Sequence, residues 1–307
     1  MAALAALCAQ ACAPAPSPPP LESVPVLQAR YLGAFGEQGD QEGQFNKPAG
    51  LSLSNDGTLY VADAGNHRVQ AFNPNGVFIR AYGRFGRDAG EMDQPVDVAV
   101  RRQARTLLYI AERGNARVQA LDTQDERYWT LIQDDGSGSF EPSGVAVGRA
   151  GDVYIANAAS LSIMRVSPQG YVQWTRGMPL IPLRMPARLR VGPDGAAVVA
   201  DPLGGRVARV DFAGSPMDSW EDAQIGAPAA AAVDSEGRWY VCDIRKKRIA
   251  ALDPQGCPTG FFGEGTLSEP VGAAVSKNNV LYVADQGEHN VKRFRLLNRN
   301  RAEGLLP

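Results

Sequence analysis

Residues 48–72 read PAGLSLSNDGTLYVADAGNHRVQAF, and variants of this stretch recur five more times along the chain. Each copy contains a short alternating run, a turn, a second apolar run that ends in a polar residue, and a third run. The copies open at prolines spaced 47, 47, 44, 42 and 42 residues apart: Pro48, Pro95, Pro142, Pro186, Pro228 and Pro270. A period in this range, built of short strands and tight turns, is typical of a radially repeated β-propeller. Because one unit cannot bury its apolar faces alone, the repeats must stack around an axis.

The runs within each copy have the composition of strands. Runs such as GLSLS and GAAVS are short, small and apolar, which suits innermost strands near a crowded axis, whereas TLYVAD and VLYVAD carry β-branched and aromatic residues. Asn-Asp-Gly at 55–57 favours a hairpin turn, and Asn-Pro-Asn-Gly at 73–76 leads into a fourth, outer run. The sequence therefore predicts an all-β protein, a six-bladed β-propeller with four antiparallel strands in each blade.

The sixth copy lacks a fourth run, because NVKRFRLL (290–297) continues into a polar C-terminal tail at 298–307. The missing strand is expected at the other end of the chain, where RYLGAFG (30–36) precedes Pro48 just as RAYG (80–83) precedes Pro95. We expect residues about 26–36 to be the outer strand of the last blade, so that one propeller domain spans residues 26–297. This pairing would close the ring and remove an open sheet edge.

The composition and the N-terminal segment limit the compartments and partners that the protein is expected to have. The 307 residues carry a formal net charge of −2 and 44% apolar residues, which fits a globular core and gives no global basic field for nucleic acid or acidic lipid. Residues 1–13 are small and apolar but too short to span a bilayer, and residues 14–25 form a proline-rich spacer. Together they resemble the end of an export signal followed by a stalk. Ala-Gln-Ala-Cys at 9–12 resembles a bacterial lipoprotein cleavage site in which Cys12 is acylated, although Ala9 stands where a large aliphatic residue is usual.

These features predict an exported, periplasmic or cell-envelope protein, attached to the membrane only through an N-terminal lipid anchor if at all. A disordered cytosolic leader is the alternative. The two cysteines of the repeat region, Cys242 and Cys257, are expected near opposite ends of one blade, roughly 15 Å apart. Disulfides tolerate Cα separations up to about 7 Å. Both cysteines should therefore be free thiols.

The second and third runs resemble a known repeat. LYVADAGNHRVQAF (59–72) is similar to the NHL repeat, a family named for an Asn-His-Leu stretch at this point, and LYIAERGNARVQAL (108–121) and LYVADQGEHNVKRF (281–294) are nearly as similar. The resemblance covers residues 26–297 and implies a propeller. Members of the family serve as protein-binding or RNA-binding platforms, as extracellular sensor modules and, in a few cases, as lyases. Fold alone does not decide among these functions.

A polar residue closes the second run in every copy. We interpret these residues as caps that accept backbone N–H groups in their own turns, with an acidic ring that holds a cation as the alternative. They align as Asp63, Glu112, Asn157, Asp201, Asp243 and Asp285.

The two histidines of the chain, His67 and His289, share one offset from this polar residue. With Asp63 and Asp285 they are the candidates for a divalent metal. A catalytic zinc normally has three protein ligands, and the equivalent positions of the other copies hold Ala116, Leu161, Gly205 and Lys247. We therefore expect no metal and no other cofactor.

Basic residues are the remaining candidates for a binding site. Arg68, Arg117, Arg206 and Arg248 align one position after the histidines, and they either bond the preceding carboxylates and neighbouring blades or form a rim that binds phosphate or carboxylate. Arg245, Lys246, Lys247 and Arg248 form a single basic loop, which is either a solvated face or a patch for an acidic partner or nucleic acid. No aromatic residues suited to base stacking cluster with it, so nucleic acid is not the expected partner.

No Gly-rich phosphate loop, HExxH, CxxC pair or GxSxG elbow occurs, and we assign no catalytic residue. We predict a monomeric, non-catalytic binding platform for a protein or an extracellular ligand. The first alternative is a propeller enzyme of lyase or lactonase type with a divalent metal in the central channel, and the second is RNA binding through a basic face. The candidate binding rim consists of Arg245, Lys246, Lys247, Arg248, His67, His289, Arg68, Arg117 and Arg206.

Overall fold

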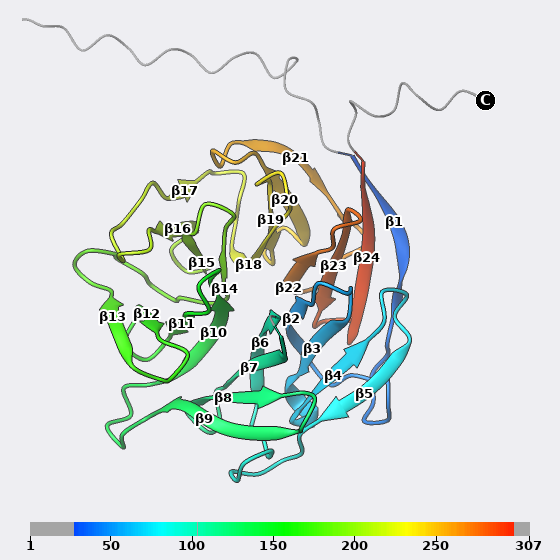
Figure 1. The fold of residues 1–307 in the computed structure, drawn as a ribbon. Helices are drawn as coiled ribbons and strands as arrows, with labels where there is room; N and C mark the ends of the chain where they lie inside the picture. The colour runs from blue at the N-terminus through cyan, green and yellow to red at the C-terminus, as the bar shows by residue number, and fades with distance from the viewer. Residues whose placement is uncertain (1–27, 103, 298–307) are drawn as a thin grey trace, which may run out of the picture.

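The computed structural model describes residues 28–102 and 104–297, which form six four-stranded antiparallel sheets around a central axis (Figure 1). In the five blades that are continuous in sequence, the strands run in chain order from the axis outward. Blade one contains β2 (Pro48–Leu53), β3 (Leu59–Asp63), β4 (Arg68–Phe72) and β5 (Phe78–Tyr82). Blade two contains β6 (Pro95–Arg102), β7 (Thr106–Glu112), β8 (Arg117–Asp122) and β9 (Arg127–Gln133). Blade three contains β10 (Pro142–Val147), β11 (Val153–Asn157), β12 (Ser162–Val166) and β13 (Val172–Arg176).

The remaining blades complete the ring, and the only helical segment in the described part of the chain is a 3-10 turn at Ala64–Asn66. Blade four contains β14 (Leu189–Val191), β15 (Ala197–Asp201), β16 (Arg206–Val210) and β17 (Trp220–Glu221). Blade five contains β18 (Pro228–Val233), β19 (Trp239–Asp243), β20 (Arg248–Leu252) and β21 (Pro258–Phe262). Blade six contains β22 (Pro270–Val275), β23 (Val280–Asp285), β24 (Asn290–Leu297) and β1 (Gln28–Phe35). The six-bladed, all-β architecture predicted from the repeats is confirmed.

The ring is closed by the first strand of the described chain. β1 pairs antiparallel with β24, from Gln28 opposite Leu297 to Phe35 opposite Val291, with a bulge between Tyr31 and Gly33. Figure 1 shows β1 along the outer edge of the last blade, next to β24. The predicted closure is therefore confirmed, and the strand that completes blade six comes from the opposite end of the chain.

The hydrophobic core lies between the blades. Six clusters of buried residues are present, and each one is built from two adjacent blades. The cluster between blades one and two, for example, joins Val69 and Tyr82 to Val98 and Ile110. Since every sheet buries both faces against its neighbours, no blade has a complete core of its own, as expected for stacked repeats.

Blade four departs from the regular pattern. Its innermost strand β14 has three residues and its outer strand β17 has two. Pro216, which forms an isolated bridge with Val210 before β17, has no N–H to donate to a ladder. Prolines also interrupt the segment that leads into the blade, at positions 179, 182 and 186. The other blades have innermost strands of six or eight residues.

Both cysteines of the propeller are free thiols, as predicted, with Cys242 buried and Cys257 exposed. Within residues 28–102 and 104–297, the structure has no helix with the length and apolar character that crossing a membrane requires. The predicted leader at 1–13, spacer at 14–25 and tail at 298–307 lie outside the described residues.

Candidate functional site

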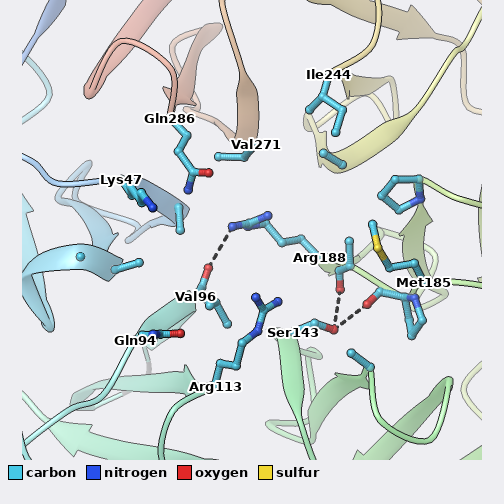
Figure 2. Close-up of a pocket in the computed structure, with 18 of the residues that line it drawn as sticks. Lys47, Gln94, Val96, Arg113, Ser143, Met185, Arg188, Ile244, Val271 and Gln286 are labelled. Atoms are coloured by element: carbon cyan, nitrogen blue, oxygen red, sulfur yellow. Dashed lines mark hydrogen bonds between the residues drawn. The ribbon is translucent and has the colours of Figure 1, made fainter.

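A cavity of about 470 Å³ opens on the axis of the propeller, at the end where the innermost strands begin (Figure 2). The residue that follows each anchor proline contributes to its wall, so all six blades line it in the same way. These residues are small or apolar except for one serine: Ala49, Val96, Ser143, Ala187, Ala229 and Val271. We call this end of the molecule the loop face, because it also carries the turns between the second and third strands of each blade.

Polar side chains surround the mouth of the axial cavity. Lys47, Gln94 and Arg113 are exposed there, and His67 and Gln286 are half-buried. The lining residues include no Asp or Glu. Arg113 forms an ion pair with Glu141, whose carboxylate lies outside the lining, at 3.0 Å. The cavity therefore has a cationic mouth and largely apolar walls.

Blade four places two arginines where the other blades have other residues. Two positions after the anchor proline, the six blades carry Gly50, Asp97, Gly144, Arg188, Ala230 and Gly272. Four positions after it, they carry Ser52, Ala99, Ala146, Arg190, Ala232 and Ala274. The two arginines are the main breaks in the symmetry of the axis, and Asp97 is the only acidic residue in either ring.

Arg190 pairs with Asp97 across the axis. Its Nη1 lies 3.1 Å from Asp97 Oδ2, and its Nη2 donates to the Leu51 carbonyl at 2.8 Å. Asp97 is fully buried and also accepts the backbone N–H groups of Val98 and Val145, each at 3.0 Å. This pair joins four blades at the axis, since its partners come from blades one, two, three and four.

Arg188 lines the cavity without a carboxylate partner. Its Nη2 donates to the Val96 carbonyl at 3.2 Å, and its Nε is buried with no hydrogen-bond partner. Burial lowers the pKa of the Arg188 guanidinium, and Asp97 opposes this shift. Figure 2 shows Arg188 extending across the cavity, with the Arg113 guanidinium directed into the same space.

The six polar residues that close the second strands are buried caps. Asp63 accepts the Asn46 N–H at 2.7 Å, and Asp285 accepts the Ser268 and Glu269 N–H groups at 2.8 Å each. The donors that the sequence predicted, in the turn that follows the cap, are present in three blades, for Asn157, Asp201 and Asp243. Backbone donors from the segment that leads into the blade recur in all six blades. The reason is that the second strand ends beside the anchor proline of its own blade, for example Asp63 opposite Pro48.

Three of the aligned arginines bond their own blade. Arg68 Nε lies 2.9 Å from Asp63, Arg117 Nε lies 2.9 Å from Glu112, and Arg206 Nε lies 3.5 Å from Asp201. Each one also donates to carbonyls of the incoming segment, such as that of Gln44 for Arg68 at 2.9 Å. Most of their side chains are covered, so they offer little to an external ligand.

The histidines connect neighbouring blades. His67, on blade one, accepts the Gln94 N–H through Nδ1 at 3.2 Å, and Gln94 precedes the anchor proline of blade two. His289, on blade six, accepts the Lys47 N–H through Nδ1 at 3.1 Å, and Lys47 precedes the anchor proline of blade one. Each imidazole thus forms a hydrogen bond across a different boundary between blades.

The donor sets do not fit a catalytic divalent metal. Asp63 is occupied by Asn46, Asn66, Arg68 and Gln70, and Asp285 is bonded to Lys292 at 2.9 Å besides its backbone donors. Across residues 28–102 and 104–297, no three His, Cys, Asp or Glu side chains come together as a group that could hold a metal ion.

The basic loop of blade five lies next to the axial cavity. A groove of about 570 Å³ is lined by Arg245, Lys247 and Leu203, and it shares Met185, Pro202 and Ile244 with the cavity. The four basic residues of the loop therefore lie on the loop face, but they are not equivalent.

Two residues of the basic loop are held by the blade. Lys246 Nζ donates to the Ala223 and Gln224 carbonyls at 3.1 and 2.7 Å. Arg248 pairs with Glu264 at 2.8 Å and stacks 3.8 Å from the centre of the Phe261 ring. Arg245 and Lys247 are exposed and form no ion pair with the described residues.

Sequence reasoning identified the basic loop and the histidines but missed Arg188, Arg113 and Lys47. A usable signal was present for Arg188, because ARLRV (187–191) breaks the run of small residues that the other innermost strands share. No comparable signal marks Arg113 or Lys47, which reach the cavity only because the ring closes.

The repeats and their geometry define a class of protein, the six-bladed β-propellers built of sequence repeats. The NHL repeat model matches residues 45–72, so the chain contains an NHL repeat within a six-bladed β-propeller. It is 26% identical over 155 residues to Protein brain tumor of Drosophila melanogaster, a match that covers 50% of this chain and 15% of that protein. It is 33% identical over 72 residues to RING finger protein nhl-1 of Caenorhabditis elegans, covering 24% of this chain and 7% of that protein.

Among solved structures, the chain is similar to a catalytically inactive virginiamycin B lyase from Staphylococcus aureus with quinupristin. The TM-score is 0.65 at 14% identity, over 88% of this chain and 100% of the lyase. This likeness concerns the fold. The matches to the curated relatives are confined to a small part of each relative's length.

Proposed function

We propose that this propeller is a non-catalytic binding module that docks a protein partner on its loop face, at the groove beside the basic loop. The observation that carries the proposal is the pair Arg245 and Lys247, two exposed cations that have no ion pair with the described residues. They border a groove that contains apolar side chains together with Ser268 and one acidic residue, Glu269. Leu203 in the same groove is 63% exposed and Met185 is 38% exposed. Long-range attraction from unpaired charges, combined with an apolar contact, suits protein recognition.

The chemistry of the groove indicates the kind of partner. Acidic side chains would pair with Arg245 and Lys247, and an apolar side chain would cover Leu203 and Met185. We therefore expect a protein segment in which one or two apolar residues are flanked by Asp or Glu. The match covers 7% of RING finger protein nhl-1 and 15% of Protein brain tumor, so the similar segment is one part of each of these longer proteins, which supports a role as a binding module.

The lyase alternative has less support. The likeness to virginiamycin B lyase is at 14% identity, and such a likeness extends to the fold and not to the chemistry. A metal-dependent reaction needs several ligands that converge on the axis. His67 is the one residue of a metal-ligating type in the lining of the axial cavity, and its Nδ1 already accepts the Gln94 N–H. RNA binding is supported only by the exposed cations of the same groove.

Site-specific photo-crosslinking in cells that express the native gene tests the docking proposal. A photoreactive amino acid in place of Leu203 should form an adduct with a protein, whereas the same amino acid at Lys277, an exposed position at the opposite end of the axis, should not. The purified partner should then bind the double variant Arg245→Ser/Lys247→Ser at least tenfold more weakly than the wild type.

Several outcomes would contradict the docking proposal. Equal adducts at both positions, unchanged affinity for the double variant, or turnover of a small substrate without a protein partner would each do so. An RNA adduct at Leu203 would favour the RNA alternative in its place.

We also propose that the protein is exported, on the basis of the leader at 1–13 and the spacer at 14–25. Fractionation of cells that carry the native gene with its true start site is the appropriate test. Recovery in the periplasm or cell envelope is the expected result, and recovery only in the cytosol would overturn the proposal.

A further inference from the structure

We propose that the axial cavity is a binding site for a small organic anion, whose charged group is held by Arg188 and Arg113, with Lys47 at the mouth. This site adjoins the groove of the basic loop, with which it shares Met185, Pro202 and Ile244, but its charged residues are different ones. Its proposal does not depend on whether a protein docks there.

The charges around the cavity are not balanced. Lys47, Arg113 and Arg188 line it and no Asp or Glu does, and of the three cations only Arg113 has a carboxylate partner among the described residues, Glu141, which lies outside the lining. Asp97, the nearest candidate to neutralise Arg188, is already bonded to Arg190 and to two backbone N–H groups. Arg188 is half-buried and its Nε is fully covered, so its charge is costly without a counter-charge, and a bound anion would remove that cost.

Hydrogen-bond donors in the cavity are also left over. Arg188 uses one bond to a backbone carbonyl, and its buried Nε has no partner. The Ser143 hydroxyl is occupied, because it donates to the Pro186 carbonyl at 2.6 Å. Figure 2 shows the Gln286 amide and the Arg113 guanidinium directed toward the same space as Arg188. Guanidinium groups bind carboxylate and phosphate oxygens in pairs of parallel hydrogen bonds, which makes oxyanions the matching ligands.

The size and walls of the cavity indicate an organic ligand. Its volume of about 470 Å³ falls within the roughly 300–1,000 Å³ that is usual for small-molecule sites. Ala49, Val96, Val271 and Ile244 supply an apolar lining that a lone inorganic ion would leave uncovered. The expected ligand has a carboxylate or a phosphate ester on a small apolar body.

The asymmetry of the site supports a ligand role. The cap contacts of this propeller recur from blade to blade, whereas the two arginines of β14 occur once, and of these only Arg190 has a carboxylate partner. Arg188 occurs in one blade only, at a position where four others have Gly or Ala. Arg188 connects blade four to blade two only through its single hydrogen bond to the Val96 carbonyl, and no ion pair holds it, which leaves its charge available to a ligand.

Calorimetric titration of the full chain, in a buffer free of phosphate and carboxylate, tests the proposal. The probes are benzoate, phenyl phosphate and inorganic phosphate, with uncharged benzamide as the matched control. We expect benzoate or phenyl phosphate to bind and benzamide not to bind. Stronger binding of benzoate would identify a carboxylate ligand, and stronger binding of phenyl phosphate a phosphate ester.

Variants localise the binding. Arg188→Met and Arg113→Met should each weaken the binding of the preferred probe at least tenfold. Arg149→Met, at an exposed position in a turn at the opposite end of the axis, should leave it unchanged, as should Arg245→Ser/Lys247→Ser in the groove. Circular dichroism verifies that each variant is folded, and the use of two independent cavity variants covers the case in which one does not fold.

The proposal is overturned if none of the probes binds. It is also overturned if benzamide binds as well as benzoate, or if every folded cavity variant binds the preferred probe like the wild type. If no anion binds but a protein partner still docks in the groove, the anion site is disproved and the proposed function is not. The two proposals are therefore tested independently.

Discussion

Arg188 and Arg190 lie two residues apart at the start of blade four, and both point into the axis region, but only Arg190 has a carboxylate. Arg190 joins Asp97 in a buried pair whose contacts reach three other blades. Arg188 has one backbone carbonyl and an unused buried Nε. Arginine therefore has a structural role at position 190 and is a candidate ligand-binding residue at position 188. The difference is that the fold supplies a carboxylate partner only for Arg190.

The basic loop of blade five repeats this contrast at the surface. Lys246 and Arg248 are bonded to the incoming segment and to Glu264. Arg245 and Lys247, in the same four-residue run, have no ion pair with the described residues and face the groove. A run of basic residues is thus not one site. Its bonded members hold the blade, and its unbonded members are available to a partner.

The largest expected effect comes from removing the counter-charge of Arg190. Asp97→Ala leaves a buried guanidinium without its carboxylate, which should lower the free energy of unfolding by about 3–5 kcal/mol. Urea denaturation followed by circular dichroism measures the loss. Adding Arg190→Met to Asp97→Ala should recover part of it, because the orphaned charge is then gone. A loss below about 1 kcal/mol for Asp97→Ala would contradict the architectural role of the pair.

An intermediate effect is expected in the basic loop. Lys246→Ser and Arg248→Ser each remove charge-assisted hydrogen bonds and should lower the free energy of unfolding by about 1–2 kcal/mol. Arg245→Ser and Lys247→Ser should change it by less than about 0.5 kcal/mol. The same denaturation measurement, applied to the four single variants, ranks them. If Arg245→Ser lowers the free energy of unfolding as much as Lys246→Ser does, the distinction between the bonded and unbonded residues of the basic loop is wrong.

The smallest expected effect concerns Cys242, a buried thiol near both arginines. Burial raises its pKa to about 12, and Arg188 and Arg190 oppose the shift. Because the folded-state pKa lies above the ordinary value, the neutral thiol stabilises the fold at lower pH, and this contribution is lost as pH rises from about 9 toward 12. Between pH 9 and pH 10 the loss should be about 1 kcal/mol.

The comparison with Cys242→Ala isolates this contribution, since burial also raises the pKa of Tyr128 to about 12 and tyrosines add to the alkaline loss. The wild type should lose stability with pH more steeply than Cys242→Ala does. Equal slopes for the two proteins would show that burial does not hold the thiol neutral, and would contradict the prediction.

The fold was predictable from the sequence because its determinants are local and repeated. Six anchor prolines, the turn glycines and the NHL-like second and third runs gave the blades, and the match between residues 30–36 and 80–83 gave the closure by β1. The irregular blade four was not predicted in detail. Its two-residue outer strand depends on how Pro216 and its neighbours meet the ladder, which spacing alone does not reveal.

The candidate sites were predictable only in part. The basic loop and the histidines stand out in an alignment of the repeats, but their contacts do not, so the bonded and unbonded members of the loop could not be distinguished. Arg188 could have been found from the break in the small-residue pattern at 187–191. Arg113 and Lys47 could not, because their approach to Arg188 depends on how different blades meet at the axis.

The most direct test of the central distinction is the stability of Arg188→Met compared with that of Arg190→Met, measured by urea denaturation in a buffer free of phosphate and carboxylate. Removing Arg190 should lower the free energy of unfolding by about 3–5 kcal/mol, because Asp97 loses its counter-charge. Removing Arg188 should leave it within about 0.5 kcal/mol of the wild type, or raise it, since the half-buried charge that is removed has no carboxylate partner. If Arg188→Met destabilises the protein as much as Arg190→Met does, Arg188 is part of the architecture and the account is contradicted.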